Sequence, residues 1–129
     1  MNIERLNKLA DFLDDLPPDL SNIEFDMDQW IVREFNIDAV KKTLYGGDVP
    51  CRACAIGMAL LAGIFESEGL KKELDRRGFY PQYRLSSGIH AVLDFFEIDL
   101  ETFYELFSAT GYWGRPSPNH VAKNIRAII

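Results

Sequence analysis

The chain of 129 residues is 47% hydrophobic and 26% charged, and its formal net charge is −6. These values are typical of one folded domain and exclude a disordered or low-complexity chain. The negative charge makes non-specific binding to nucleic acid an unfavourable function, because an acidic surface repels phosphate.

The N-terminal segment is amphipathic and acidic, and it lacks the apolar core and the cleavage site of a signal peptide. The longest apolar run, residues 53–65, is shorter than the roughly 20 residues of a membrane-spanning helix. Two cysteines without a targeting segment fit a reducing compartment. We therefore predict one domain, residues 1–129, that is cytoplasmic and does not bind a membrane.

Apolar residues recur at helical spacing from residue 2 to residue 16, and two prolines follow. This pattern predicts a first helix that ends before Pro17. Apolar and polar residues alternate over 23–27, which permits a short extended segment. Asp26 or Asp28 is then suited to cap a short helix around Trp30.

Residues 38–47 predict a helical turn that ends at two glycines. From 53 to 65 nearly every residue is apolar or small, which indicates a helix without a wet face in the centre of the domain. Ala55, Ala59 and Gly63 lie four residues apart on it, and we expect a neighbouring helix to approach along this stripe.

The polar residues 67–78 predict a short surface helix, and residues 79–85 an extended link or loop. Serines at 86 and 87 and Asp99 are suited to cap the next two helices, and Ser117–Pro118 to begin the last one. The pattern predicts a mainly all-α fold, a single compact helical domain around a buried central helix, with room for one short extended segment.

Cys51 and Cys54 form a C-x-x-C pair at the start of the central helix. With His90 and His120 they would supply four zinc ligands, although this spacing matches no compact zinc module. A redox pair or a cysteine nucleophile with a histidine base is a further alternative, since a helix N-terminus and a nearby arginine lower a thiol pKa. The favoured interpretation is structural: Cys54 is a small buried hydrophobe and His90 a semi-buried histidine. We expect no catalytic residue, metal or cofactor.

The charge is uneven along the chain. Residues 1–40 contain ten acidic and three basic side chains, whereas residues 106–129 contain three basic and no acidic ones. Acid pairs without calcium-loop spacing are better explained as caps or as a docking surface than as a cation site. The candidate acidic surface consists of Asp14, Asp15, Asp19, Glu24, Asp26 and Asp28.

A second candidate surface combines loop aromatics with arginines, the residue types that dominate binding energy at protein interfaces. Its alternative is a set of rings that fold back onto the core. The residues are Tyr80, Tyr83, Arg84, Tyr112, Trp113 and Arg115.

Five segments occur in an order that resembles a loose group of small, largely uncharacterised phage and bacterial proteins: "RLNKLADFLDDLPP", "FDMDQW", "CRACAIGMAL", "FFEIDLETFYELF" and "SPNHVAKNIRAII". The resemblance covers most of the chain, but the C-x-x-C spacing departs from the longer cysteine spacing of that group. It implies a phage or mobile-element context and no activity. The matching positions are Leu16–Pro18, Phe25, Trp30, Cys54, Gly57, Phe107 and Pro118.

These observations favour a small acidic protein–protein interaction module rather than an enzyme. Its expected partner is another protein, including an inhibited host defence or nucleic-acid-processing protein, and a homodimer is compatible with the sequence. One alternative is the cysteine or zinc site. The other is a helix-turn-helix regulator formed by the last two helices, which the net charge and the long loop between them disfavour.

Overall fold

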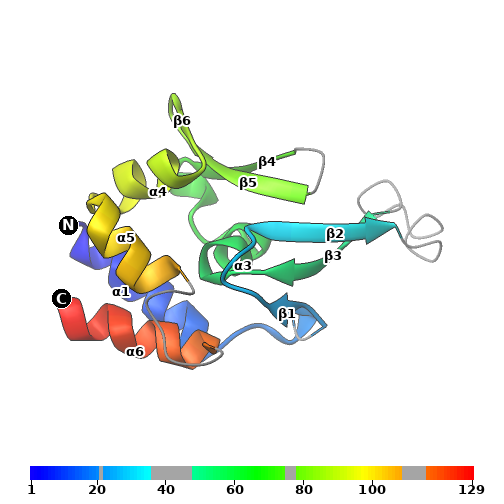
Figure 1. Ribbon diagram of the computed structural model, residues 1–129, viewed down its shortest axis with the longest axis horizontal. Coiled ribbons are helices and arrows are strands. Elements are labelled where there is room, and N and C mark those ends of the chain that lie inside the picture. The colour runs from blue at the N-terminus through cyan, green and yellow to red at the C-terminus, as the bar shows by residue number, and fades with distance from the viewer. Residues whose placement is uncertain (21, 36–47, 75–77, 109–115) are drawn as a thin grey trace.

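A computed structural model describes residues 1–20, 22–35, 48–74, 78–108 and 116–129, with the backbone alone at 32–35 and 48–51 (Figure 1). The described helices are α1 (Ile3–Asp14), α3 (Ala55–Ala62), α4 (Ile89–Phe96), α5 (Leu100–Phe107) and α6 (Pro118–Ile128). Short 3₁₀ turns lie at Pro18–Leu20 and Glu66–Glu68. Helices α1 and α6 lie side by side, with both chain termini at the same end of the molecule.

The strands form one six-stranded sheet within the described part of the chain. They are β1 (Glu24–Phe25), β2 (Ile31–Phe35), β3 (Asp48–Ala53), β4 (Leu70–Leu74), β5 (Gly78–Tyr83) and β6 (Ser86–Ser87). The order across the sheet is β1-β3-β2-β5-β4, and β6 pairs with β5. All pairs are antiparallel except β1 with β3.

The prediction of a mainly helical protein is confirmed, but the fold is mixed α/β rather than all-α. A short helix was expected around Trp30, but strand β2 begins there at Ile31. A surface helix was expected over residues 67–78, but these residues include strand β4. Lysine, glutamate and leucine favour helices in isolation, but pairing with β5 over five positions outweighs that preference in β4. The helical turn predicted for 38–47 lies outside the described residues.

Several local signals are confirmed. Helix α1 ends before the two prolines. The carboxylate of Asp99 accepts a hydrogen bond from the Thr102 N–H, and the hydroxyl of Ser117 accepts one from the His120 N–H. Helix α4 differs, because Gly88 precedes it with φ of 62° while the two serines belong to β6. The caps of α1 and α3, where the Asn2 and Cys54 side chains accept hydrogen bonds from the Arg5 and Gly57 N–H groups, were not predicted.

Helix α3 is central, as predicted, but shorter than expected. Residues Ala55–Leu60 are buried, and the preceding residues belong to β3. Helix α1 contacts α3. The backbone of Trp30 also lies so close to Gly57 that a Cβ there would be 1.8 Å from the Trp30 carbonyl oxygen. A glycine is required at this one position.

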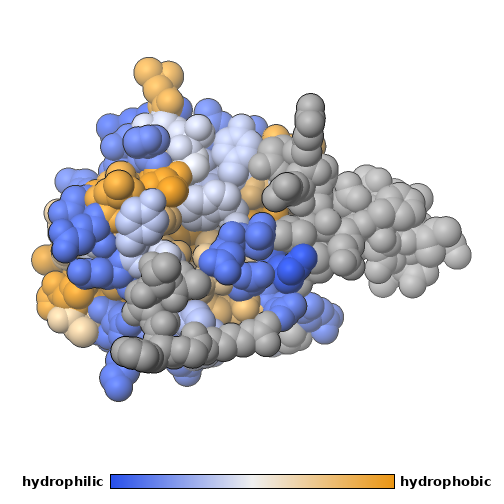
Figure 2. All heavy atoms as spheres, viewed as in Figure 1, coloured by the Kyte–Doolittle hydropathy of each residue, from blue (hydrophilic) through white to orange (hydrophobic). Residues whose placement is uncertain are grey.

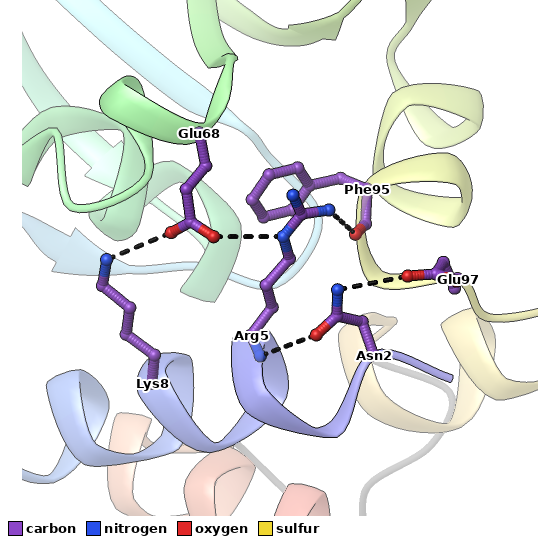
Figure 3. Close-up of polar contacts among 6 residues, drawn as sticks. All are labelled: Asn2, Arg5, Lys8, Glu68, Phe95 and Glu97. Atoms are coloured by element: carbon purple, nitrogen blue, oxygen red, sulfur yellow. Dashed lines mark hydrogen bonds and ion pairs between the residues drawn. The ribbon is translucent and has the colours of Figure 1, made fainter.

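Arg5 joins α1 to the rest of the core (Figure 3). Its guanidinium donates to the Phe95 carbonyl (2.7 Å) and to the Glu68 carboxylate (3.2 Å), and it lies 4.0 Å from the centre of the Phe95 ring. Burial lowers the Arg5 pKa, but bonding to Tyr83 and Glu68 outweighs this and raises it. Around this joint, Phe65, Phe95 and Phe96 form edge-to-face pairs with ring centres 5.0 to 5.6 Å apart.

Candidate interaction site

An aromatic-walled pocket of about 260 Å³ lies between the segment before β2, the start of α3 and the end of α5. Its walls come from elements far apart in the chain, and Asp28, Gln29 and Ser108 contribute polar groups. We call it the Trp30 pocket. It is lined by Met27, Asp28, Gln29, Trp30, Cys54, Ile89, Phe103, Tyr104, Phe107 and Ser108.

The segment from Asp26 to Trp30 is held to α3 and β3 by its backbone. The Asp26 N–H donates to the Ala53 carbonyl (2.9 Å), and the Cys54 N–H donates to the carbonyls of Gln29 (2.9 Å) and Trp30 (3.2 Å). The Asp26 carboxylate accepts the Asp28 N–H at 2.9 Å, forming a local turn. These bonds fix Asp28 as an exposed residue of the pocket.

The aromatic wall is the part that sequence reasoning missed. The Trp30 ring lies 6.1 Å from the Phe103 ring, and Phe103 lies 5.7 Å from Tyr104 and 5.8 Å from Phe107. Phe103 and Phe107 are buried, whereas Tyr104 is 45% exposed. The helical spacing of these aromatics was a visible signal, but it indicates a core face just as well as a pocket wall.

The predicted acidic surface is partly neutralised. The Arg126 guanidinium of α6 pairs with Asp14 and, at 2.8 Å, with Asp11, so α1 and α6 are joined where the surface was expected to begin. Arg52 lies 3.8 Å from the Asp26 carboxylate. Asp15, Asp19, Glu24 and Asp28 are exposed. Of the six residues predicted for the acidic surface, Asp28 lines the Trp30 pocket.

The predicted aromatic surface is divided. Tyr83 is buried against Phe95, with ring centres 5.1 Å apart, and Tyr80 is half-buried. Arg84 is exposed and its guanidinium lies 4.9 Å from the Tyr83 ring. Beside it Leu85 is fully exposed, and Figure 2 shows an apolar projection where β5 turns into β6. Tyr112, Trp113 and Arg115 lie outside the described residues.

Cys54 is buried and precedes α3, where its sulfur accepts a hydrogen bond from the Gly57 N–H at 3.4 Å. Burial raises the pKa of the thiol to about 11; the backbone bonds act in the opposite direction and are weaker. A helix start was expected to lower the thiol pKa, and for Cys54 that expectation is wrong, because loss of hydration outweighs the backbone donors. The prediction that Cys54 is buried is confirmed. Cys51 lies in β3, not in the helix.

We expect Cys54 of the native protein to resist iodoacetamide at neutral pH, since the protonated thiol is a poor nucleophile and is shielded from solvent. Alkylation should rise only as the pH approaches about 11 or when the protein is unfolded. Peptide mass spectrometry distinguishes Cys54 from Cys51 and serves as the measurement. Rapid labelling of Cys54 at neutral pH in the folded protein would contradict this assignment.

The histidines do not join Cys54 in a metal site. Across the described ranges, no group of three or more histidine, cysteine, aspartate or glutamate residues is arranged to hold a metal ion. His90 is exposed on α4 rather than semi-buried, and His120 is half-buried in the first turn of α6. The Trp30 pocket instead offers an apolar recess with the Asp28 carboxylate and the Gln29 amide beside it.

Comparison with protein families, curated proteins and solved structures finds no match to the chain. The resemblance to small phage and bacterial proteins therefore stays a prediction. Among the described helices, none combines the length and the apolar composition needed to cross a membrane.

Proposed function

We propose that this chain is a non-enzymatic protein–protein interaction module, of phage or bacterial origin, that receives a large apolar side chain of its partner in the Trp30 pocket. One observation carries the proposal: four aromatic rings and Met27 enclose a recess with Asp28 beside it. Aromatic pockets of this kind take the anchor residues that dominate protein interfaces.

The size and the charge of the site favour a protein segment over other ligands. Its volume of about 260 Å³ is below the roughly 300–1,000 Å³ of most small-molecule sites and suits one side chain. Asp28 in the lining favours a partner with a basic residue next to the anchor. Inhibition of a nucleic-acid-processing protein would follow if the basic surface of that protein were the one covered.

The test is selection of binders from a random peptide library on the folded protein. We expect enriched peptides to combine an aromatic or large aliphatic residue with lysine or arginine, and to bind more weakly as salt is raised. Asp28→Lys should weaken binding on the order of tenfold, because it replaces attraction by repulsion. Tyr104→Ala should weaken it to a similar degree by removing an exposed wall of the pocket.

Two matched variants on α5 serve as controls. Glu105→Lys makes the same charge change at an exposed residue that does not line the pocket, and Leu100→Ala removes a side chain that is 48% exposed, close to the 45% of Tyr104. Both should leave binding unchanged. If the controls weaken binding as much as the pocket variants, or if the selected peptides lack basic residues, the proposal is wrong.

A further inference from the structure

Strand β4 is an edge strand, and one of its sides is unpaired among the described strands (Figure 1). It pairs with β5 from Leu70 opposite Tyr83 to Leu74 opposite Phe79. Leu74, at its end, is 57% exposed, although it is a large apolar residue. An open edge carrying an exposed leucine is a surface that another strand can extend.

The backbone direction along this edge follows from Pro81. Pro81 has no N–H, and its carbonyl accepts a hydrogen bond from the Gly88 N–H at 2.8 Å, on the β6 side of β5. Lys72, which lies opposite Pro81, therefore belongs to a non-hydrogen-bonded pair, and its own N–H and C=O point to the open edge. Leu70 and Leu74 share this direction. The Leu70 N–H already donates to the Phe65 carbonyl on that side, so at Leu70 a second strand can bond only to the carbonyl, whereas at Lys72 it can bond to both groups.

We propose that β4 pairs antiparallel with β4 of a second copy of this chain, in the register that centres the two strands on Lys72. The sequence of the strand, Leu-Lys-Lys-Glu-Leu, is complementary to itself in this register. Lys71 lies opposite Glu73 twice, and Leu70 lies opposite Leu74 twice. Such direct cross-strand pairs of opposite charge or of apolar residues stabilise a sheet.

This register matches the exposure of the side chains. Lys71 and Glu73 are both exposed on one face of β4, where each can reach its counterpart. On the other face, Leu74 would be covered by the region around Leu70 of the second copy, beside a pocket of about 300 Å³ that Leu60 and Phe79 also line. The two Lys72 residues meet at the twofold axis and repel each other, so the dimer is weak and reversible.

Sedimentation velocity over a range of protein concentrations tests the dimer through charge reversal. Lys71→Glu places glutamate at both 71 and 73, and Glu73→Lys places lysine at both, so the opposing 71 and 73 side chains then carry like charges. Each single variant should therefore self-associate on the order of tenfold more weakly than the wild type. A mixture of the two variants should form a heterodimer, because both opposing 71–73 pairs are then again a lysine and a glutamate. The double variant Lys71→Glu/Glu73→Lys should dimerise like the wild type.

A second variant tests the backbone contact. Lys72→Pro removes an N–H that faces the open edge and none that bonds to β5, so it should abolish dimerisation while the far-UV circular dichroism and the melting temperature stay close to those of the wild type. A wild type that remains monomeric at every concentration overturns the proposal. So do single charge variants that dimerise like the wild type, or a mixture that stays monomeric.

Discussion

Gly57→Ala is expected to lower the free energy of unfolding by about 3 kcal/mol, because the added methyl group overlaps the backbone of Trp30. The added Cβ would lie 1.8 Å from the Trp30 carbonyl oxygen and 3.0 Å from the Ala53 Cβ. The Trp30 carbonyl cannot withdraw without cost, because the Cys54 N–H donates to it and to the Gln29 carbonyl. Overlap of this extent must displace the segment before β2.

The sign of the change in stability distinguishes close packing from helix propensity. Helix propensity alone would make Gly57→Ala stabilising by about 1 kcal/mol. Ala62→Gly, at an exposed position of the same helix, measures that propensity term and should destabilise by about 1 kcal/mol or less. Urea denaturation of the three proteins provides the comparison. An alanine variant at position 57 as stable as the wild type would refute the close packing of Trp30 on α3.

Arg5→Met is expected to destabilise the fold by about 2–3 kcal/mol, because the variant keeps the apolar stem but leaves the Phe95 carbonyl without its donor. It also removes the guanidinium from the face of the Phe95 ring and from the Glu68 carboxylate (Figure 3). The pKa of Glu68 responds to the same contacts. Burial raises this pKa, but hydrogen bonds from Lys8 and Arg5 outweigh burial and lower it.

Lys8→Met is the matched control for Arg5→Met. It removes the same charge from the same helix, and Lys8 bonds to the same carboxylate at 3.1 Å, but its side chain is 47% exposed against 20% for Arg5. An exposed ion pair contributes less than about 1 kcal/mol. Thermal or urea unfolding should therefore separate the two variants clearly. Equal losses would mean that the Phe95 carbonyl and ring contribute nothing beyond the charge of Glu68.

The part of the fold that the sequence predicts is the part that local interactions decide. Three features follow from residues within one or two turns of each other: the end of α1 before Pro17, the caps at Asp99 and Ser117, and the burial of α3. Each of these features depends on a side chain and its own helix, and no distant segment competes with it.

The strands depend on partners distant in the sequence. Leu70 and Leu74 are four residues apart, which suits one face of a helix and equally one face of a strand, and only the presence of β5 decides between the two. Likewise, nothing in the segment around Trp30 shows that it will lie under α3. The β-sheet was missed for this reason.

The Trp30 pocket was missed for a related reason. Its wall joins Trp30 to Phe103, which are separated by most of the chain, and both residues read as ordinary core positions when each is taken alone. Of the predicted interaction residues, Asp28 lines the pocket, Asp26 supports it through the turn, and Tyr83 belongs to the core. The pocket could not be predicted because its residues are far apart in the sequence, not because their types are unsuited to a binding site.

The most direct measurement is a methyl NMR spectrum of the protein labelled at its three methionines, recorded while a peptide from the selection is added. Met27 lines the Trp30 pocket, Met58 is buried in α3 outside its lining, and Met1 is at the exposed N-terminus. Docking of an anchor residue in the pocket predicts a shift of the Met27 signal while those of Met58 and Met1 stay in place. A peptide that binds without moving the Met27 signal would contradict the assignment of this pocket as the interaction site.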